Sequence, residues 1–257
     1  MASSPVPELA EPATACAERL LAADSVVLAS HIDADGLTSA AIAAAALERA
    51  GIRFETVFAK QLDEEEIAAI AATDHDTALF TDFGSGQLDI IADHEAAGDF
   101  TPVIADHHQP ADETTEFHLN PLLYGLDGAT ELSGAGATYV LARALGTTKS
   151  ATDGATRSAT DGGVTADATA TDEPGQDNRD LAALAVVGAV GDRQSGVDGL
   201  TGANEGIVEE GVAAGVVEAG TDITLYGKQT RPLPKLLEYA TEARIPGISN
   251  DTAGAIE

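Results

Sequence analysis

SVVLASHIDADGLTSAAIAAAALERAG (residues 25–51) is the stretch from which we infer the fold. Its first six residues form a short apolar run bounded by serines, which is typical of a buried strand. The alanine-rich run at 37–51 predicts a helix that ends at its final glycine. Between the two, His31, Asp33 and Asp35 stand on alternate positions where the strand ends.

The same alternation of strand and helix continues along the chain. Strands that alternate with helical runs are joined as parallel βαβ units. We therefore predict an α/β fold with an open, mostly parallel sheet flanked by helices. The apolar run at 179–194 fits either a helix or a strand, and we favour the helix. The elements expected after residue 51 are strands at 52–58, 77–83 and 101–108 and helices at 63–73, 86–98, 133–146 and 179–194.

Two later segments differ in composition from this alternating part. Residues 147–178 are poor in apolar residues and include the near-repeat SATDGATRSATDGG, so we predict a disordered insertion or a surface loop. We assign residues 1–200 to one domain that contains this insertion. Residues 201–257 carry helical patterns at 202–217 and 233–243. We interpret them as a helical connector or as the start of a truncated second domain.

The composition is strongly acidic. With 43 acidic and 13 basic residues, the 257-residue chain has a formal net charge of −30. This balance suggests a cytosol of very high salt, where the Debye length falls to about 3 Å and self-repulsion is screened. High charge with few aromatic residues also suits a disordered chain. Because 44% of the residues are hydrophobic and occur in organised runs, we expect a folded protein from a halophilic source.

Nothing in the sequence suggests export or membrane insertion. Cys16 is the single cysteine, which excludes an intrachain disulfide and fits a reducing compartment. The N-terminal residues lack a basic segment and an apolar signal core. The longest apolar run, at 40–47, is too short to span a bilayer. We expect a soluble, cytoplasmic protein with no membrane partner.

Candidate metal ligands follow several of the expected strands. In open α/β sheets, sites form at the carboxyl ends of strands. Carboxylates gathered there repel one another unless cations neutralise them. Mixed carboxylate and imidazole ligands suit Mn²⁺ or Zn²⁺ better than Ca²⁺, and this many ligands supports two ions. The candidates at the ends of these runs are His31, Asp33, Asp35, Asp82, Asp106, His107, His108 and Asp192.

Each of these residues also has an ordinary structural explanation. An aspartate at a strand end is commonly a helix cap or a turn residue, and for Asp82 taken alone that explanation is the better one. The alternation at 31–35 also suits an exposed strand edge, and the paired histidines suit a polar turn. The four segments taken together favour a metal site.

Four short motifs, in this order, resemble those of the DHH phosphoesterase superfamily. The resemblance spans roughly residues 20–200. Within the superfamily, the HxDxDG form and the segment LSGAG at 132–136 look most like the RecJ-type single-strand exonucleases, particularly their archaeal relatives. The motifs are HIDADG at 31–36, TDFG at 81–84, ADHH at 105–108 and GDRQ at 191–194.

The resemblance implies a centre of two metal ions. It implies that His31 and Asp33 hold one Mn²⁺ ion. It implies that the second ion is held by Asp35, His107 and Asp192, with Mg²⁺ as the alternative to Mn²⁺.

The resemblance also implies the catalytic roles. Asp82 would bridge the two ions, His108 would contact the scissile phosphate, and Asp106 would orient the neighbouring histidine. A water held between the ions would be the nucleophile, with no covalent enzyme intermediate.

A phosphate site is suggested by the segment LSGAGA. Small residues at a helix start leave backbone N–H groups exposed, which favours a phosphate, and the candidates there are Ser133, Gly134 and Gly136. Close packing of the helix on a strand explains the same residues equally well. Arg193 is a fourth candidate, either for touching substrate or for capping.

The resemblance implies a metal-dependent phosphodiesterase, and the leading interpretation is an exonuclease acting on single-stranded DNA or RNA in DNA repair. RecJ-type enzymes carry a second domain with a glycine-rich motif, which this sequence does not show. The only concentration of positive charge lies at Lys228, Arg231 and Lys235. Two alternatives stay open. One is a phosphoesterase of short oligoribonucleotides, cyclic dinucleotides or pyrophosphate, and the other is a non-catalytic partner of replication or repair proteins.

Overall fold

The computed structural model describes residues 4–160, 177–196, 199–220, 231–239 and 246. The chain divides into two units, Met1–Glu218 and Ala219–Glu257. In the second unit the described residues form the helix α8 (Leu233–Tyr239). The first unit is an α/β domain with a parallel sheet of five strands, in the order β2-β1-β3-β4-β5, so the predicted fold class is confirmed.

The sheet is buried at its centre and exposed at one edge. Every residue of β3 is buried, and so are most of β1 and β4, whereas β2 alternates between half-buried and exposed positions. Continuous burial is typical of parallel strands that are covered on both faces. The strands are β1 (Val26–His31), β2 (Phe54–Ala59), β3 (Thr77–Thr81), β4 (Thr101–Ala105) and β5 (His118–Leu119).

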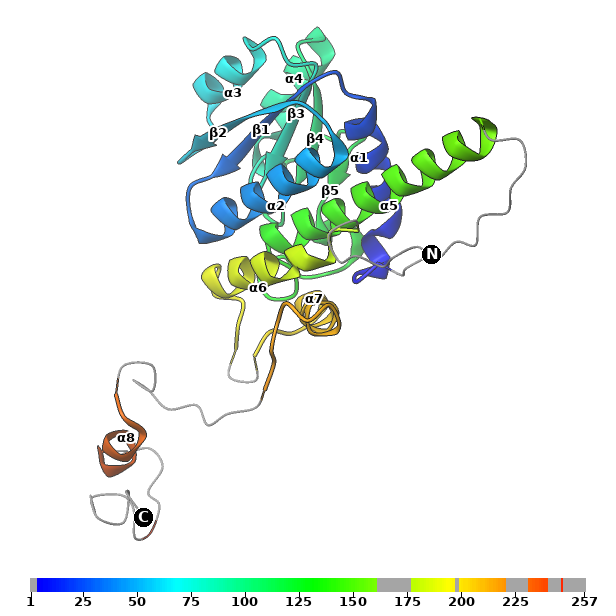
Figure 1. The fold of residues 1–257 in the computed structure, drawn as a ribbon. Coiled ribbons are helices and arrows are strands. Elements are labelled where there is room, and N and C mark those ends of the chain that lie inside the picture. Colours follow the sequence, from blue (N-terminus) through cyan, green and yellow to red (C-terminus); the bar gives the residue numbers. More distant parts are fainter. Residues whose placement is uncertain (1–3, 161–176, 197–198, 221–230, 240–245, 247–257) are drawn as a thin grey trace. The chain divides into compact units, whose positions relative to one another are not determined.

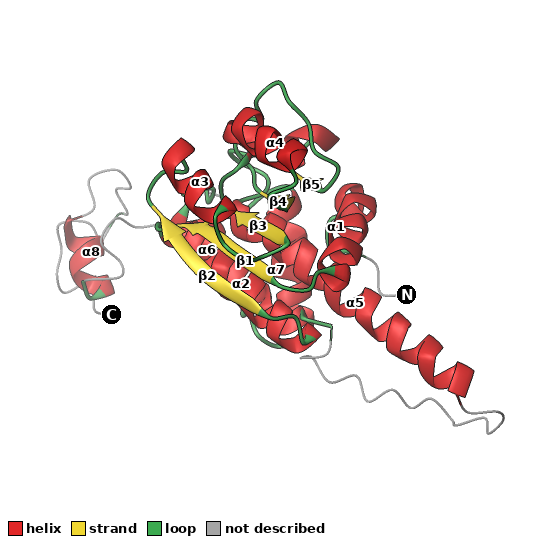
Figure 2. Ribbon diagram, turned by 90° about the horizontal axis from the view of Figure 1, so that it is seen from above, coloured by secondary structure: helices red, strands yellow, loops and turns green. Residues whose placement is uncertain are grey.

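Helices cover both faces of the sheet (Figures 1 and 2). One face is covered by α1 (Ala10–Ala22), α2 (Ala34–Ala50) and α5 (Gly134–Thr160). The opposite face is covered by α3 (Glu64–Ala71) and α4 (Leu88–Ala97). Two further helices, α6 (Ala182–Gly191) and α7 (Ala203–Ala213), pack outside this first layer, α6 against α2 and α5 and α7 against α6. Short 3-10 turns occur at Pro7–Leu9, Ser85–Gln87, Pro121–Tyr124 and Arg179–Leu181.

The core has two layers because neighbouring residues of a strand point to opposite faces. In β1, Val26 and Leu28 join the cluster under α1, α2 and α5, whereas Val27 and Ala29 join the cluster under α3 and α4. Both clusters are mainly aliphatic, with Tyr139 in the first and Phe80, Phe83 and Phe100 in the second. The strand predicted within residues 25–51 therefore lies inside the fold, and its end is enclosed by elements from both layers.

Two elements were not predicted from the sequence. The helix α1 lies in the N-terminal region, where its buried residues Ala13, Cys16, Ala17 and Leu20 recur at helical spacing. The strand β5 has only two residues and pairs beside β4, which is too short for a periodicity signal. Among the described residues, no helix combines the length and apolar character needed to cross a bilayer.

The helix α5 extends beyond the helix predicted at 133–146. It continues to Thr160, so the first part of the segment 147–178 is helical, and the prediction of a loop there is wrong. Residues 161–176 lie outside the described part of the chain. Small hydroxyl residues are accommodated in this helix, where the side chain of each donates to the backbone carbonyl four residues earlier. The residues that do so are Thr147, Ser150 and Thr152.

Candidate metal centre

Four segments that are distant in the sequence meet at the carboxyl end of the sheet. β1 and β3 are neighbours whose connections leave in opposite directions, which makes this the switch point where open sheets bind ligands. β1 ends at His31, while Asp82 and Asp106 directly follow β3 and β4. Asp192 arrives from a different kind of element, since it is the C-terminal cap of α6.

His31, Asp33 and Asp82 form the first group of candidate ligands, with one ligand atom from each lying within 4.8 Å of the others. His31 Nδ1 lies 3.0 Å from Asp33 Oδ2 and 3.6 Å from Asp82 Oδ2. Asp33 is also the N-cap of α2, because its Oδ1 accepts from the Gly36 N–H at 2.9 Å. The capping explanation therefore holds for Asp33, and its second oxygen still faces the site.

The second group consists of Asp35, His107 and Asp192, again with ligand atoms within 4.8 Å of one another. His107 Nε2 lies 3.7 Å from Asp35 Oδ2, and His107 Nδ1 lies 3.8 Å from Asp192 Oδ2. The His107 Nδ1 atom is 2.6 Å from the carbonyl oxygen of Gly128. This contact requires a proton on Nδ1, so in the neutral ring the Nε2 lone pair faces the carboxylates.

Asp82 stands between the two groups. Its Oδ1 lies 3.3 Å from His107 Nε2, whereas its Oδ2 faces His31. The residue adopts a φ of 58°, in the left-handed region that few residues other than glycine occupy. Gly134 lies against it, and a Cβ there would be 2.5 Å from Asp82 Oδ1. Backbone strain and a glycine neighbour are thus both used to bring this carboxylate into the centre.

The buried atoms of this centre fit a divalent cation. Both carboxylate oxygens of Asp82 and Nε2 of His107 are buried, and none of the three has a hydrogen-bond partner in the described part of the chain. A buried carboxylate without partners costs several kcal/mol unless a cation or a proton compensates it. Carboxylate and imidazole together are the donors that Mn²⁺ and similar ions accept. The Asp and His cluster is therefore suited to a divalent metal.

The electrostatics show the same need for positive charge. Burial raises the pKa of Asp82 to about 8, and the nearby Asp35 and Asp106 carboxylates add to the rise, against the opposing effect of His107. Burial opposes protonation of His107, but Asp82, the Gly128 carbonyl and the other carboxylates raise its pKa to about 10. Burial also raises the pKa of Asp35. Without a metal ion, Asp82 and His107 retain protons at neutral pH.

A separate pair, Asp106 and His108, borders the centre. Asp106 is fully buried, and its Oδ1 accepts from His108 Nδ1 at 2.8 Å. Burial opposes ionisation of Asp106, but His108, His107 and the Ser85 N–H hold its pKa well below the usual range. The hydrogen bond to Asp106 in turn raises the pKa of His108. The pair therefore presents a half-exposed imidazole beside the ligand groups, and the carboxylate favours the charged form of that ring.

The start of α5 binds a carboxylate of the chain itself. The backbone N–H groups of Gly134 and Ala135 donate to the two oxygens of Asp35, at 2.7 and 3.0 Å. The Gly136 N–H donates to the Ser133 hydroxyl. The phosphate role predicted for Ser133, Gly134 and Gly136 is therefore corrected, because this helix start holds Asp35 instead.

Arg193, the fourth predicted phosphate contact, lies at the surface beside the centre. It has a φ of 63° and an exposed side chain. The structure places it next to Asp192 without bringing it into either ligand group. Its predicted role stays a prediction.

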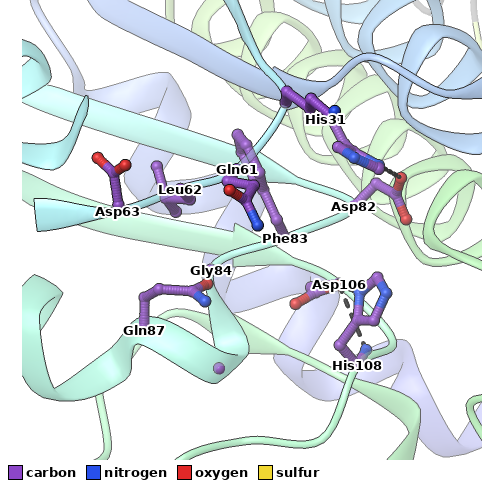
Figure 3. Close-up of a pocket in the computed structure, with 12 residues that line it drawn as sticks. His31, Gln61, Leu62, Asp63, Asp82, Phe83, Gly84, Gln87, Asp106 and His108 are labelled. Carbon is purple, nitrogen blue, oxygen red and sulfur yellow. Dashed lines mark hydrogen bonds and ion pairs between the residues drawn. The ribbon is translucent and has the colours of Figure 1, made fainter. Parts of the chain in front are cut away.

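A cavity of about 400 Å³ opens beside the centre. Figure 3 shows His31, Asp82, Asp106 and His108 on one side of it, Asp63 and Gln87 on the other, and Gln61 and Phe83 between them. The remaining lining residues are Lys60, Leu62, Gly84 and Gly86. Two of the candidate ligands, His31 and Asp82, thus line a cavity of ligand size.

Several residues that hold this arrangement had no role in the sequence-based interpretation. Asn120 donates to the Ser85 hydroxyl and to the backbone carbonyl of His108, each at 2.9 Å. His118 is buried and lies 2.9 Å from the hydroxyl of Ser85, whose backbone N–H donates to Asp106. Gln194 donates to Asp192. Only Gln194 carried a signal, since it stands inside the GDRQ motif.

The chain is similar to proteins of known sequence and structure. It is 28% identical over 230 residues to an uncharacterized protein of Methanocaldococcus jannaschii, covering 86% of this chain and 44% of that protein. The chain therefore spans less than half of that relative's length.

Two solved structures share the fold. RecJ from Thermus thermophilus in complex with Mn²⁺ matches with a TM-score of 0.57 and 22% identity, covering 81% of this chain and 27% of RecJ. A second structure, exonuclease RecJ bound to manganese, matches with a TM-score of 0.56 and 22% identity, over 81% of this chain and 48% of the other. At this identity the likeness concerns the fold.

Two family models match the sequence. The model described as "DHH-CID domain" matches residues 225–257. The model described as "DHH family, N-terminal domain" matches residues 25–162, which is more than half of the chain and includes three of the four motifs. By this match, and with an Asp and His cluster at the carboxyl ends of its strands, the chain belongs to the DHH family of phosphoesterases.

Proposed function

We propose that this chain is a metal-dependent phosphodiesterase that removes nucleotides from an end of single-stranded DNA or RNA, using two Mn²⁺ or Mg²⁺ ions. The observation that carries the proposal is the position of Asp82. Its two buried oxygens have no hydrogen-bond partner in the described residues, and they face His107 on one side and His31 on the other. A carboxylate in that position can bridge two cations.

The ligands divide between two ions in this proposal. His31 and Asp33 hold the first ion, and Asp35, His107 and Asp192 hold the second, with Asp82 shared. When bound, two such ions supply an activated water and neutralise charge on the phosphate.

His108 is the residue for contact with the phosphate. Its Nδ1 is held by Asp106, so in its charged form Nε2–H is free to donate to a phosphate oxygen in the cavity. Asp106 orients the ring and favours its charged form, because the pKa of His108 is raised by this contact. The residue stabilises negative charge and forms no covalent bond in this scheme.

The cavity supports an anionic substrate. Lys60 is the only lysine or arginine among its described lining residues, in a chain that carries only 13 such residues. Gln61 and Gln87, which also line the cavity, add amide donors. We propose that these side chains hold a phosphate or sugar adjacent to the scissile phosphate.

The preference for single-stranded nucleic acid rests on the resemblance of the four motifs to those of RecJ-type exonucleases. One manganese-bound structure that shares the fold is an exonuclease, RecJ. Replication or repair proteins are the partners that we propose on the basis of the same motifs.

A second candidate is a phosphodiesterase of small substrates, such as short oligoribonucleotides or cyclic dinucleotides. The cavity of about 400 Å³ favours it, because that volume suits a ligand of one or two nucleotides. In this case Lys60 would hold the second phosphate of the small substrate.

The test is hydrolysis of a 5′- or 3′-labelled single-stranded oligonucleotide in concentrated KCl, with Mn²⁺ or with EDTA. Stepwise shortening that requires Mn²⁺ is expected, and Asp82→Asn should abolish it while the exposed control Asp74→Asn should not. Cleavage of dinucleotides and cyclic dinucleotides alone would favour the second candidate. Folded protein that binds no Mn²⁺ would exclude both and leave a non-catalytic binding role.

A further inference from the structure

The side chains of Gln194 and Asn204 connect α7 to the candidate metal centre. We propose that they form an amide relay that positions His107 and Asp192 for metal binding. The relay consists of Gln194 and Asn204 alone. Both side chains are buried, with 5% and 2% of their surface exposed. The inference rests on the proposed metal-dependent function, because it assigns a purpose to residues that touch the ligands of that site.

One nitrogen of Gln194 contacts Asp192 directly and reaches His107 through the Gly128 carbonyl. Gln194 Nε2 donates to Asp192 Oδ2 at 2.8 Å and to the Gly128 carbonyl, also at 2.8 Å. The same carbonyl lies 2.6 Å from His107 Nδ1. A carbonyl oxygen has two lone pairs, so Gly128 serves both side chains. The amide therefore fixes Asp192 directly and His107 through a shared acceptor.

The direction of the relay follows from the chemistry of its partners. The Asp192 carboxylate and the Gly128 carbonyl can only accept hydrogen bonds. Gln194 must turn its NH₂ group toward them, which leaves its Oε1 facing α7. Asn204 Nδ2 donates to that oxygen at 2.7 Å. The orientation of the Gln194 amide thus determines that of the Asn204 amide, and the hydrogen bond from Asn204 prevents Gln194 from rotating.

Asn204 is itself held at a fixed position. Its backbone N–H donates to the Glu131 carbonyl at 2.8 Å. On the same helix, Glu210 accepts from Arg143 Nη2 at 2.8 Å and from Arg143 Nε at 3.0 Å. Tyr139 adds a third hydrogen bond to Glu210 at 2.6 Å. The bidentate Arg143–Glu210 pair holds α7 against α5, and so α7 provides a rigid support for the relay.

Gly128 has to be a glycine for the shared acceptor to exist. A Cβ at this position would overlap the backbone carbonyl of His107. The close approach places the Gly128 carbonyl in line with His107 Nδ1 and turns Nε2 toward Asp82 and Asp35, at 3.3 and 3.7 Å. Residues that orient a ligating histidine through its second nitrogen tune metal affinity, typically by about 10- to 100-fold.

The experiment measures Mn²⁺ binding by isothermal titration calorimetry on the full chain. The variants are Gln194→Met and Asn204→Leu, which preserve the size of the side chains, and the double variant. We expect each single variant to weaken one of two Mn²⁺ sites by about 10-fold or more. Because the two residues act in series, the double variant should lose no more than Gln194→Met alone.

A control separates positioning from general destabilisation. Leu20→Ala removes a fully buried side chain of α1, on an element that supplies no candidate ligand. It should lower the melting temperature and leave both Mn²⁺ dissociation constants unchanged. Asn204 acts on the ligands only through Gln194. Asn204→Leu therefore gives an independent result if Gln194→Met does not fold.

Two spectroscopic outcomes complete the test. Electron paramagnetic resonance of the wild type with two equivalents of Mn²⁺ should show a spin-coupled pair, and the relay variants should show isolated Mn²⁺ at the same loading. Variants with wild-type affinity and a wild-type coupled spectrum would overturn the relay while the proposed function stands. A wild type that binds no Mn²⁺ would overturn both.

Discussion

His107 Nε2 lies 3.3 Å from Asp82 Oδ1, and in the described residues neither atom has a hydrogen-bond partner. The pair is buried at the carboxyl ends of β3 and β4. From its other side the imidazole is held by the Gly128 carbonyl. The two groups thus face each other across a position where a proton or a cation is required.

The first prediction concerns pH. The pKa of Asp82 is raised to about 8 and that of His107 to about 10. At pH values between the unfolded-state and folded-state pKa of each group, the folded protein therefore binds more protons than the unfolded chain. The stability that these protons supply is lost as pH rises through those folded values. A bound metal ion replaces the protons. The increase in melting temperature caused by Mn²⁺ should therefore grow from about pH 6 to about pH 8.5.

Differential scanning fluorimetry with and without Mn²⁺ measures this difference across pH. Asp82→Asn is the control, because it removes one of the two titrating groups and should flatten the curve. A Mn²⁺ effect that stays constant or shrinks toward alkaline pH would contradict the assignment of these groups as ligands.

The second prediction concerns Asp82→Asn itself. The variant should lose at least about 100-fold in Mn²⁺-dependent hydrolysis, since one side chain serves both proposed ions. At about pH 8.5 the metal-free variant should be more stable than the wild type by about 1 kcal/mol, or about 3 °C in melting temperature. The gain is expected because the desolvation cost of the buried Asp82 carboxylate exceeds its attraction to His107, as its raised pKa of about 8 indicates. Asparagine also tolerates the left-handed backbone of this position.

Asp74→Asn is the matched control for the second prediction. Asp74 is exposed and lies before β3, so its substitution changes the net charge equally and should alter neither activity nor stability. If Asp82→Asn destabilised the metal-free protein, the carboxylate would have partners other than a metal ion.

The third prediction concerns the cavity. Lys60→Ala should raise KM by about 10-fold, as expected for the loss of a charge-assisted contact, with Mn²⁺ affinity and kcat nearly unchanged. Steady-state kinetics on a short labelled oligonucleotide measures both constants. Lys149→Ala, on α5 and outside this cavity, changes the net charge by the same amount and serves as the control. An effect of equal size in both variants would show that only the overall charge matters.

The fourth prediction concerns salt. With a formal net charge of −30, the folded chain repels itself at low ionic strength, and screening reduces this cost. The free energy of unfolding should increase from about 0.1 M to about 2 M KCl. A sucrose series of equal osmolality is the comparison, because sucrose stabilises by exclusion without screening charge. A smaller gain in KCl than in sucrose would refute a screening effect.

Part of the centre could be predicted from sequence alone, because its motifs stand at the ends of recognisable elements. The order of strand, HIDADG and helix at 25–51 is local, and local periodicity determines such elements. The same holds for Asp82 and for the residues 105–108, each of which follows a buried strand. The parallel connection of these strands then requires their ends to meet at one edge.

Other features depend on contacts that no local pattern contains. The phosphate site predicted at the start of α5 is a case, since only the tertiary structure shows that Asp35 accepts from the N–H groups of Gly134 and Ala135. The extension of α5 to Thr160 is another, since the composition of residues 147–160 favoured a loop.

The class of fold, most of the strands and helices and the residues able to ligate a metal could be predicted from the sequence, because these depend on side-chain chemistry and short-range periodicity. The tertiary structure alone decided which ligands share a group, and that α7 supports Asp192 and His107 through Gln194 and Asn204. The physical reason is that hydrogen bonds between distant segments depend on packing in three dimensions. Asp35 and Gly134 are 99 residues apart and yet 2.7 Å from each other.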